Sequence, residues 1–139
     1  DEPRGTYCKH LSGDNLWNAG LAITAARGFH ADYVQFSNVW ANTGGGGGEG
    51  YAETGVDIEP NNAADAVEDI SFDYIDARGC GKYGFAVVAK SMATQGFVYV
   101  GYLASYDNGN DGQGSETSGD GLNLVNCRNI HIAVQSCGG

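Results

Sequence analysis

Two acidic residues, Asp57 and Glu59, have the types and spacing in this chain that best suit acid–base catalysis. They alternate with Val56 and Ile58 in a short run that begins at Gly55. In a β-strand, Val56 and Ile58 would face one side and both carboxylates the other, with the acidic Cβ atoms about 6.6 Å apart. Paired carboxyl groups in glycoside hydrolases lie about 5–9.5 Å apart. One acid, with its pKa raised by its neighbour, would then donate a proton, and the other would act as base or nucleophile.

Other interpretations of this pair stay open on the sequence alone. Both side chains can be solvated acids on the outer face of a strand, or they can hold Ca²⁺ together with backbone carbonyl groups from the next turn of the chain. Asp120 stands directly before Gly121, at the start of a later copy of the same run. Asp120 is therefore a third candidate catalytic carboxyl group.

The run at Gly55 is one of four copies of the pattern Gly-apolar-x-apolar, and the other copies begin at Gly20, Gly84 and Gly121. Aligned, the copies form two apolar columns, Leu21/Val56/Phe85/Leu122 and Ile23/Ile58/Val87/Leu124. A solenoid buries its core in this way, because each repeat covers the apolar face of the one before.

A second pattern, apolar-x-apolar-x-x-apolar, precedes each later copy and also follows the last one. Its copies begin at Val34, Ile70, Val98 and Ile130, with a fainter copy at Thr6. The expected columns are Val34/Ile70/Val98/Ile130 and Phe36/Phe72/Val100/Ile132 on the inner side, and Gln35/Ser71/Tyr99/His131 on the outer side.

Short strands, glycine turns and aligned columns predict an all-β fold, a parallel β-helix of about four rungs in a single domain over residues 1–139. A sandwich of antiparallel hairpins is the alternative, but it predicts turn signals and no aligned columns. No amphipathic helix covers either end of the expected solenoid. Uncapped ends expose strand edges. We therefore expect a segment of a longer solenoid or a subunit whose ends stack on other chains.

The two patterns, joined by a polar turn, resemble the right-handed parallel β-helix repeat of pectate-lyase-like proteins from Thr6 to Cys137. Residues 55–62 also resemble stretches in secreted carbohydrate-active proteins and phage tailspikes of that superfamily. The resemblance implies a right-handed solenoid, a polysaccharide or cell-surface glycan as partner, and a location outside the cell or on a virion surface. Thr54 stands where the polygalacturonase-like branch has an acid, so the resemblance does not extend to that branch's hydrolase site.

Further candidate site residues follow from the same alignment. Lys90 and Arg128 follow Gly-led strands and suit a uronate carboxylate, while Asn123 shares the outward column of Asp57. Tyr99 offers an aromatic ring for a sugar. The glycine-rich insertion at residues 107–120 is rich in oxygen ligands that suit Ca²⁺, and its candidate metal ligands are Asp107, Asp111 and Glu116.

Composition limits the partners. Seven Lys and Arg residues against seventeen Asp and Glu residues give a formal net charge of −10. This balance disfavours nucleic acid and anionic membrane surfaces, since both require clustered cations. No apolar run approaches the roughly 20 residues of a membrane-spanning helix, so we expect no membrane insertion.

The chain has four cysteines, Cys8, Cys80, Cys127 and Cys137. An even number of cysteines with few lysines is typical of an oxidising, extracellular setting, and three disulfide pairings are possible. Structural thiols without a disulfide are the alternative.

Two hypotheses of function follow. The first is an extracellular, carbohydrate-facing β-helix that binds or cleaves a polysaccharide through Asp57 and Glu59. The second is a non-catalytic structural subunit that stacks end to end into fibres or a trimeric shaft.

Overall fold

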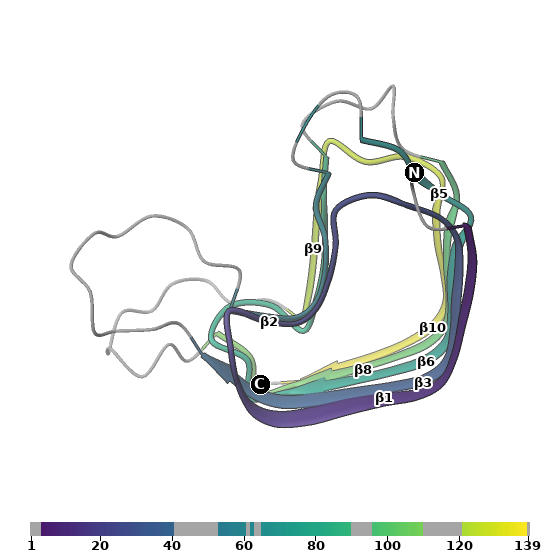
Figure 1. The fold of residues 1–139 in the computed structure, drawn as a ribbon. Helices are drawn as coiled ribbons and strands as arrows, with labels where there is room; N and C mark the ends of the chain where they lie inside the picture. Colours follow the sequence, from purple (N-terminus) through teal and green to yellow (C-terminus); the bar gives the residue numbers. More distant parts are fainter. Residues whose placement is uncertain are drawn as a thin grey trace.

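The computed structural model describes residues 4–40, 53–60, 62, 65–89, 96–109 and 121–138, and its regular elements are all β-strands (Figure 1). These strands form two sheets in which every pairing is parallel. No helix in the described part of the chain is long and apolar enough to cross a membrane. The expectation of an all-β chain built from parallel strands is confirmed.

Sheet A is the larger sheet. Its strands lie in the order β1 (Arg4–Trp17), β3 (Ala26–Trp40), β6 (Ile70–Arg78), β8 (Val98–Tyr106) and β10 (Ile130–Gly138), with β5 (Val67–Glu68) paired beside β3. Sheet B contains β2 (Ala19–Ile23), β4 (Thr54–Ile58), β7 (Phe85–Val88) and β9 (Leu122–Val125), in that order.

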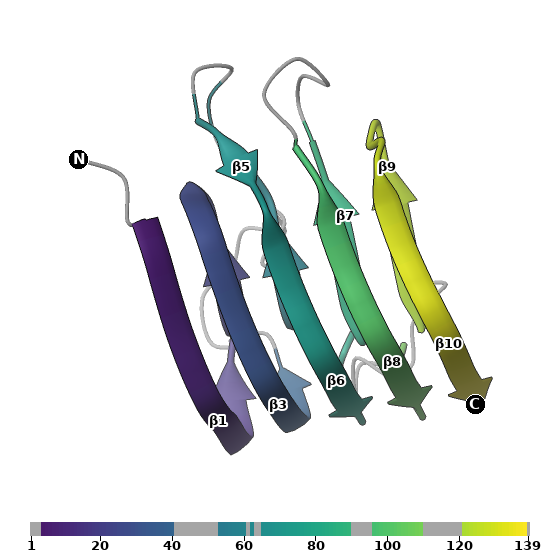
Figure 2. The same cartoon turned by 90° about the vertical axis from the view of Figure 1, so that its right-hand side faces the viewer.

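The chain alternates between the two sheets, so spatial order follows sequence order in both. Apart from β5, which precedes β6 within sheet A, each strand of sheet A from β1 to β8 is followed by a strand of sheet B, and each such pair is one repeat. Figure 2 shows the strands of successive repeats lying side by side and pointing the same way. The described chain contains four such repeats and the sheet A strand β10 of a fifth. This arrangement is compatible with a parallel β-helix.

The two-residue gap in the apolar-x-apolar-x-x-apolar pattern marks a bend in the strands of sheet A. In β6, Phe72 and Ile75 are both fully buried, while Asp73 is exposed and Tyr74 is half-buried. A straight strand alternates its side chains with a period of two and could not bury both apolar residues. Figure 1 shows where these strands turn, between one side of the cross-section and its lower edge.

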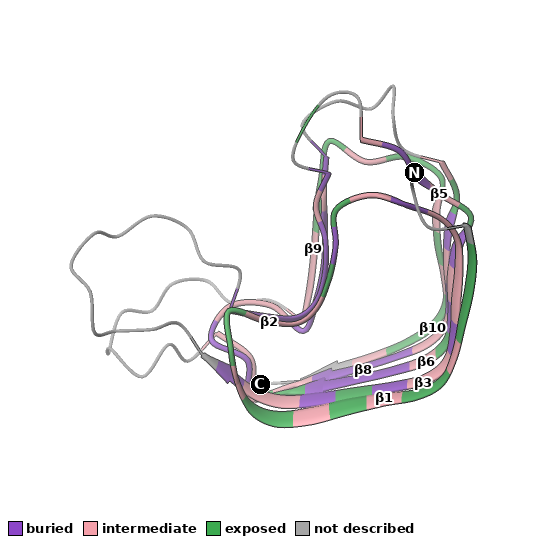
Figure 3. Ribbon diagram, viewed as in Figure 1, coloured by how far each residue is buried: buried purple, intermediate pink, exposed green. Residues whose placement is uncertain are grey.

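Sheet B has the register that the sequence predicts. Val56 pairs with Leu21 and Phe85, and Ile58 pairs with Ile23 and Val87. The side chains of Val56 and Ile58 face the interior, where residues of both sheets form one apolar core. Figure 3 shows that burial is most extensive in the middle repeats, whereas β1 and β10 carry many exposed residues.

The predicted register of β3 is wrong. Val34 pairs with Ile75, and Ala31 pairs with Phe72, so the copy in β3 begins at Phe29 rather than at Val34. The strand carries two overlapping copies of the pattern, and the earlier one places a small Ala beside the large Phe72 ring. Phe36 then pairs with Ala77 beyond the bend, again a large residue beside a small one. Complementary volumes of this kind pack the core without strain.

The register error also affects the outward columns. His30, rather than Gln35, pairs with Ser71, and the column continues through Tyr99 and His131. Tyr7 of β1 completes the column on the other side of His30.

Among the side chains that the structure describes, Cys8, Cys80 and Cys127 are all free thiols. The side chain of Cys137 lies outside the described residues. The expectation of disulfides is therefore not supported, whereas the alternative of structural thiols fits. Burial raises the pKa of Cys80 to about 11. A thiol that resists deprotonation is a packing group rather than a nucleophile.

Gly55 lies where the backbone of the neighbouring repeat leaves no room for a side chain. A Cβ atom at Gly55 would lie 2.7 Å from the carbonyl oxygen of Gly84 and 2.8 Å from the Cβ of Ala77. Gly55→Ala is therefore expected to lower the free energy of unfolding by about 1–3 kcal/mol, measured by urea denaturation, because backbone atoms have to move.

Gly13→Ala is the matched control. Its new Cβ would lie 2.6 Å from Leu16 Cδ1, the end of a half-buried side chain that can rotate away. The change at Gly13 is expected to stay within about 0.5 kcal/mol. Equal losses in the two variants would contradict the tight packing at Gly55.

Candidate functional site

Strand β4 positions the acidic pair at the centre of sheet B. Val56 and Ile58 are fully buried on the inner side of the strand. Asp57, between them, lies in the outward column that also contains Ala22, Ala86 and Asn123. The strand therefore holds Asp57 on the outer side, as the period-two alternation predicts.

Asp57 is nevertheless buried. Only 7% of its surface is exposed, and its neighbour Ala86 on β7 is buried as well. Glu59 remains half-buried at the end of the same strand. The interpretation of both residues as solvated surface acids is therefore wrong for Asp57.

This burial changes the acidity of Asp57. Loss of solvation disfavours its ionised form, and the negative charge of Glu59 adds to the effect, so the pKa of Asp57 rises to about 6. A carboxylic acid that keeps its proton to this pH, beside another carboxyl group, has the properties of a general acid.

The raised pKa predicts a specific dependence of stability on pH. The carboxyl group of Asp57 has an ordinary value of 3.8 and a value of about 6 in the folded chain. Between these values the folded state binds more protons than the unfolded state, so stability falls as pH rises through this window. In urea denaturation, Asp57→Asn is expected to match the parent chain near pH 3.5 and to exceed its stability above pH 6. A constant difference across the range would contradict the shift.

The other predicted site residues fall into three groups. Asn123 is half-buried in the Asp57 column, two strands away or about 9.6 Å, and Arg128 is exposed in the turn between β9 and β10. Tyr99 lies on the outer side of sheet A, across the core from Asp57, and Asp107 is exposed just after β8. Lys90, Asp111, Glu116 and Asp120 lie outside the described residues.

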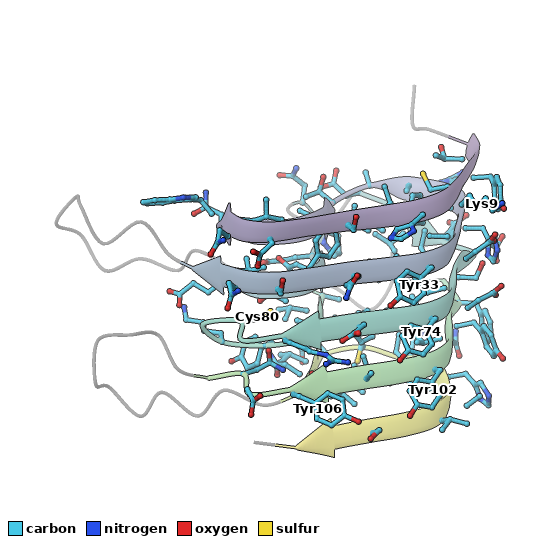
Figure 4. All side chains as sticks on the ribbon, turned by 90° about the horizontal axis from the view of Figure 1, so that it is seen from below. Lys9, Tyr33, Tyr74, Cys80, Tyr102 and Tyr106 are labelled. Atoms are coloured by element: carbon cyan, nitrogen blue, oxygen red, sulfur yellow. The ribbon has the colours of Figure 1, made fainter. Side chains whose placement is uncertain are left out.

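An aromatic column on sheet A was not expected from the sequence. Tyr33, Tyr74 and Tyr102 come from successive repeats, and their rings stack with centroids 5.0 Å apart at each step (Figure 4). Each of these tyrosines directly precedes the last apolar residue of the bend pattern. This signal is visible in the sequence once β3 is aligned from Phe29.

A polar patch lies beside this column. Ser12, Gly13, Asp14, Gln35 and Ser37 line a shallow pocket of about 280 Å³. Ser37 Oγ and Asn38 Nδ2 donate hydrogen bonds to Asp14 Oδ1 and lower the pKa of that carboxyl group. The patch offers hydrogen-bonding groups of the kind that a glycan hydroxyl can use.

Near the end of β6, Arg78 forms two hydrogen bonds to the buried carboxylate of Asp76, at 2.6 and 3.0 Å. Its guanidinium carbon lies 5.5 Å from the centroid of the Tyr106 ring. Each of these charged groups therefore has a partner within the chain.

Comparisons of this chain with protein-family models, curated proteins and solved structures found no match. Any functional conclusion therefore depends on the residues and geometry of the chain itself.

Proposed function

We propose that this chain is a right-handed parallel β-helix of the pectate-lyase-like kind that binds and cleaves an extracellular polysaccharide on the outer face of sheet B. The observation that carries the proposal is the burial of Asp57 beside Glu59, with a pKa raised to about 6. A protonated acid on β4 and a second carboxyl group directly after the strand are the two groups that cleavage of a glycosidic bond requires.

In this mechanism Asp57 donates its proton to the glycosidic oxygen as the bond to the sugar carbon breaks. Glu59 acts on the same sugar, either as the base that activates a water molecule or as the nucleophile. Asn123, in the same outward column, donates a hydrogen bond to a sugar hydroxyl group, and Arg128 in the turn after β9 attracts an acidic substituent.

The test is an assay of the full chain against a panel of polysaccharides, with and without added Ca²⁺. Reducing ends report hydrolysis, and ultraviolet absorbance reports the unsaturated sugars that a lyase releases. We expect release of products from at least one polysaccharide. A chain that releases no product from any member of the panel would contradict cleavage, and binding without cleavage would restrict the proposal to a recognition module.

A second candidate function is end-to-end assembly of copies into fibres or a trimeric shaft. Within the described chain, β1 and β10 each pair with a single neighbour in sheet A, and Trp17 on β1 and Val134 on β10 are 63% and 51% exposed. Open strand edges of this kind are templates for pairing with another chain. Filaments or oligomers in electron microscopy and analytical ultracentrifugation would support assembly, and a monomer at high concentration would contradict it.

A further inference from the structure

Three side chains with metal-binding atoms converge on the outer side of the bend in sheet A. His30 and Asp32 belong to β3, and Asp73 lies opposite Asp32 on β6, as the flanking register pairs require. One ligand atom from each residue lies within 4.8 Å of the other two. His30 Nε2 is 3.1 Å from Asp32 Oδ1 and 3.9 Å from Asp73 Oδ1.

The convergence brings two carboxyl groups together. Asp32 and Asp73 occupy directly opposite positions on neighbouring parallel strands, where like charges repel. Lys9 lies opposite Asp32 on β1, yet it forms no ion pair within the described part of the chain. Between the two carboxylates lies the imidazole nitrogen Nε2, which can carry a proton or donate its lone pair to a metal ion.

The spacing fits a small metal ion. A tetrahedral site with bonds of about 2.1 Å places its ligand atoms about 3.4 Å apart. The separations of Nε2 from the two carboxylate oxygens, 3.1 and 3.9 Å, lie on either side of that value. We propose that His30, Asp32 and Asp73 bind a divalent transition-metal ion of the Zn²⁺ type.

Neighbouring groups orient these ligands. Ser71 Oγ lies 2.8 Å from His30 Nδ1, and Tyr7 donates a hydrogen bond of 2.6 Å to Asp32 Oδ2. When Nδ1–H donates to Ser71, the lone pair of Nε2 faces the two carboxylates. The Tyr7 bond occupies Oδ2 and leaves Oδ1 facing the imidazole. Such outer hydrogen bonds fix the tautomer and the orientation of metal ligands.

The site remains open to solvent. The side chains of His30, Asp32 and Asp73 are 36%, 38% and 64% exposed, so an ion can enter and can keep water as an additional ligand. An imidazole ligand favours Zn²⁺ and its neighbours over Ca²⁺, which prefers oxygen alone. The site lies across the core from Asp57 and is independent of the proposed cleavage site on sheet B.

The test is a titration of the full, reduced chain with Zn²⁺, followed by calorimetry and by ¹⁵N NMR of the histidine rings. We expect one ion per chain and a large shift of the Nε2 resonance of His30, with His10 and His131 unchanged. His30→Gln and Asp73→Asn are expected to lower the affinity more than tenfold. Ser71→Ala, which removes only the orienting hydrogen bond, is expected to lower it by about 10–100-fold.

The matched control is His131→Gln, which removes an exposed histidine from the same outward column and is expected to leave the affinity unchanged. Binding that persists unchanged in His30→Gln would place the ion elsewhere in the chain and overturn the proposal. The absence of binding to the parent chain, or an unshifted His30 resonance, would also overturn it. The NMR result on the parent chain decides the question even if a variant fails to fold.

Discussion

Replacing Asp57 with asparagine is expected to lower the rate of polysaccharide cleavage by about 10²–10⁴-fold, the usual contribution of a general acid. The amide has nearly the shape of the protonated acid but cannot transfer a proton to the glycosidic oxygen. Glu59→Gln is expected to have a loss of similar size, because the amide can act neither as base nor as nucleophile. The measurement is kcat from the release of reducing ends on the polysaccharide that the parent chain cleaves best.

The matched control for Asp57→Asn is Asp69→Asn, the same change at an exposed turn residue outside the site. It is expected to retain full activity. Since Asp57 loses its proton as pH rises through about 6, the parent activity is expected to decline above that value. Asp57→Asn is expected to remain folded and to be more stable than the parent chain above pH 6, so its loss of activity cannot arise from unfolding. An asparagine variant that retains activity would exclude Asp57 as the acid.

The register of sheet B could be predicted from the sequence because a glycine lies near the start of each strand, and two apolar residues follow it in alternating positions. A shift of one residue would turn Val56 and Ile58 to the outside and Asp57 into the core, so a single register is compatible with burial. The register of β3 could not be read in this way. Its overlapping copies, which begin at Phe29 and Val34, both satisfy the pattern, and the choice between them depends on the volumes of neighbours in β6.

The candidate site, like the registers of the strands, could be predicted only in part. The alternation at Gly55 correctly placed Asp57 on the outer side of β4, but the burial that raises its pKa arises from tertiary packing, which no local pattern reports. The cluster at His30 was missed for another reason. Asp32 and Asp73 meet only in the observed register, and the expected register placed Gln35 where His30 lies.

Phe72→Ala is expected to destabilise the fold more than truncation of any other apolar side chain in the described part of sheet A. Phe72 is fully buried, and its ring contacts those of Phe29 and Phe85, with centroids 5.8 and 6.3 Å away. It therefore connects neighbouring repeats and both sheets of the core. Truncation to alanine removes the ring and leaves a cavity, which costs about 3–5 kcal/mol of the free energy of unfolding. The cavity cannot collapse easily, because the backbone hydrogen bonds of sheet A fix the spacing of the strands.

Phe97→Ala provides the comparison, since it removes the same ring from a position that is 47% exposed just before β8. Its loss is expected to stay below about 1 kcal/mol, because nearly half of this residue remains in contact with water in the folded chain and its removal leaves no closed cavity. Urea denaturation of the parent chain and both variants, with the slope of each transition compared, gives the two differences. Strand β6 pairs with β3 and β8, so a cavity at Phe72 is also expected to increase amide hydrogen exchange in β3, β6 and β8 more than in β10. Equal losses for the two phenylalanines would contradict a core that runs continuously through the repeats.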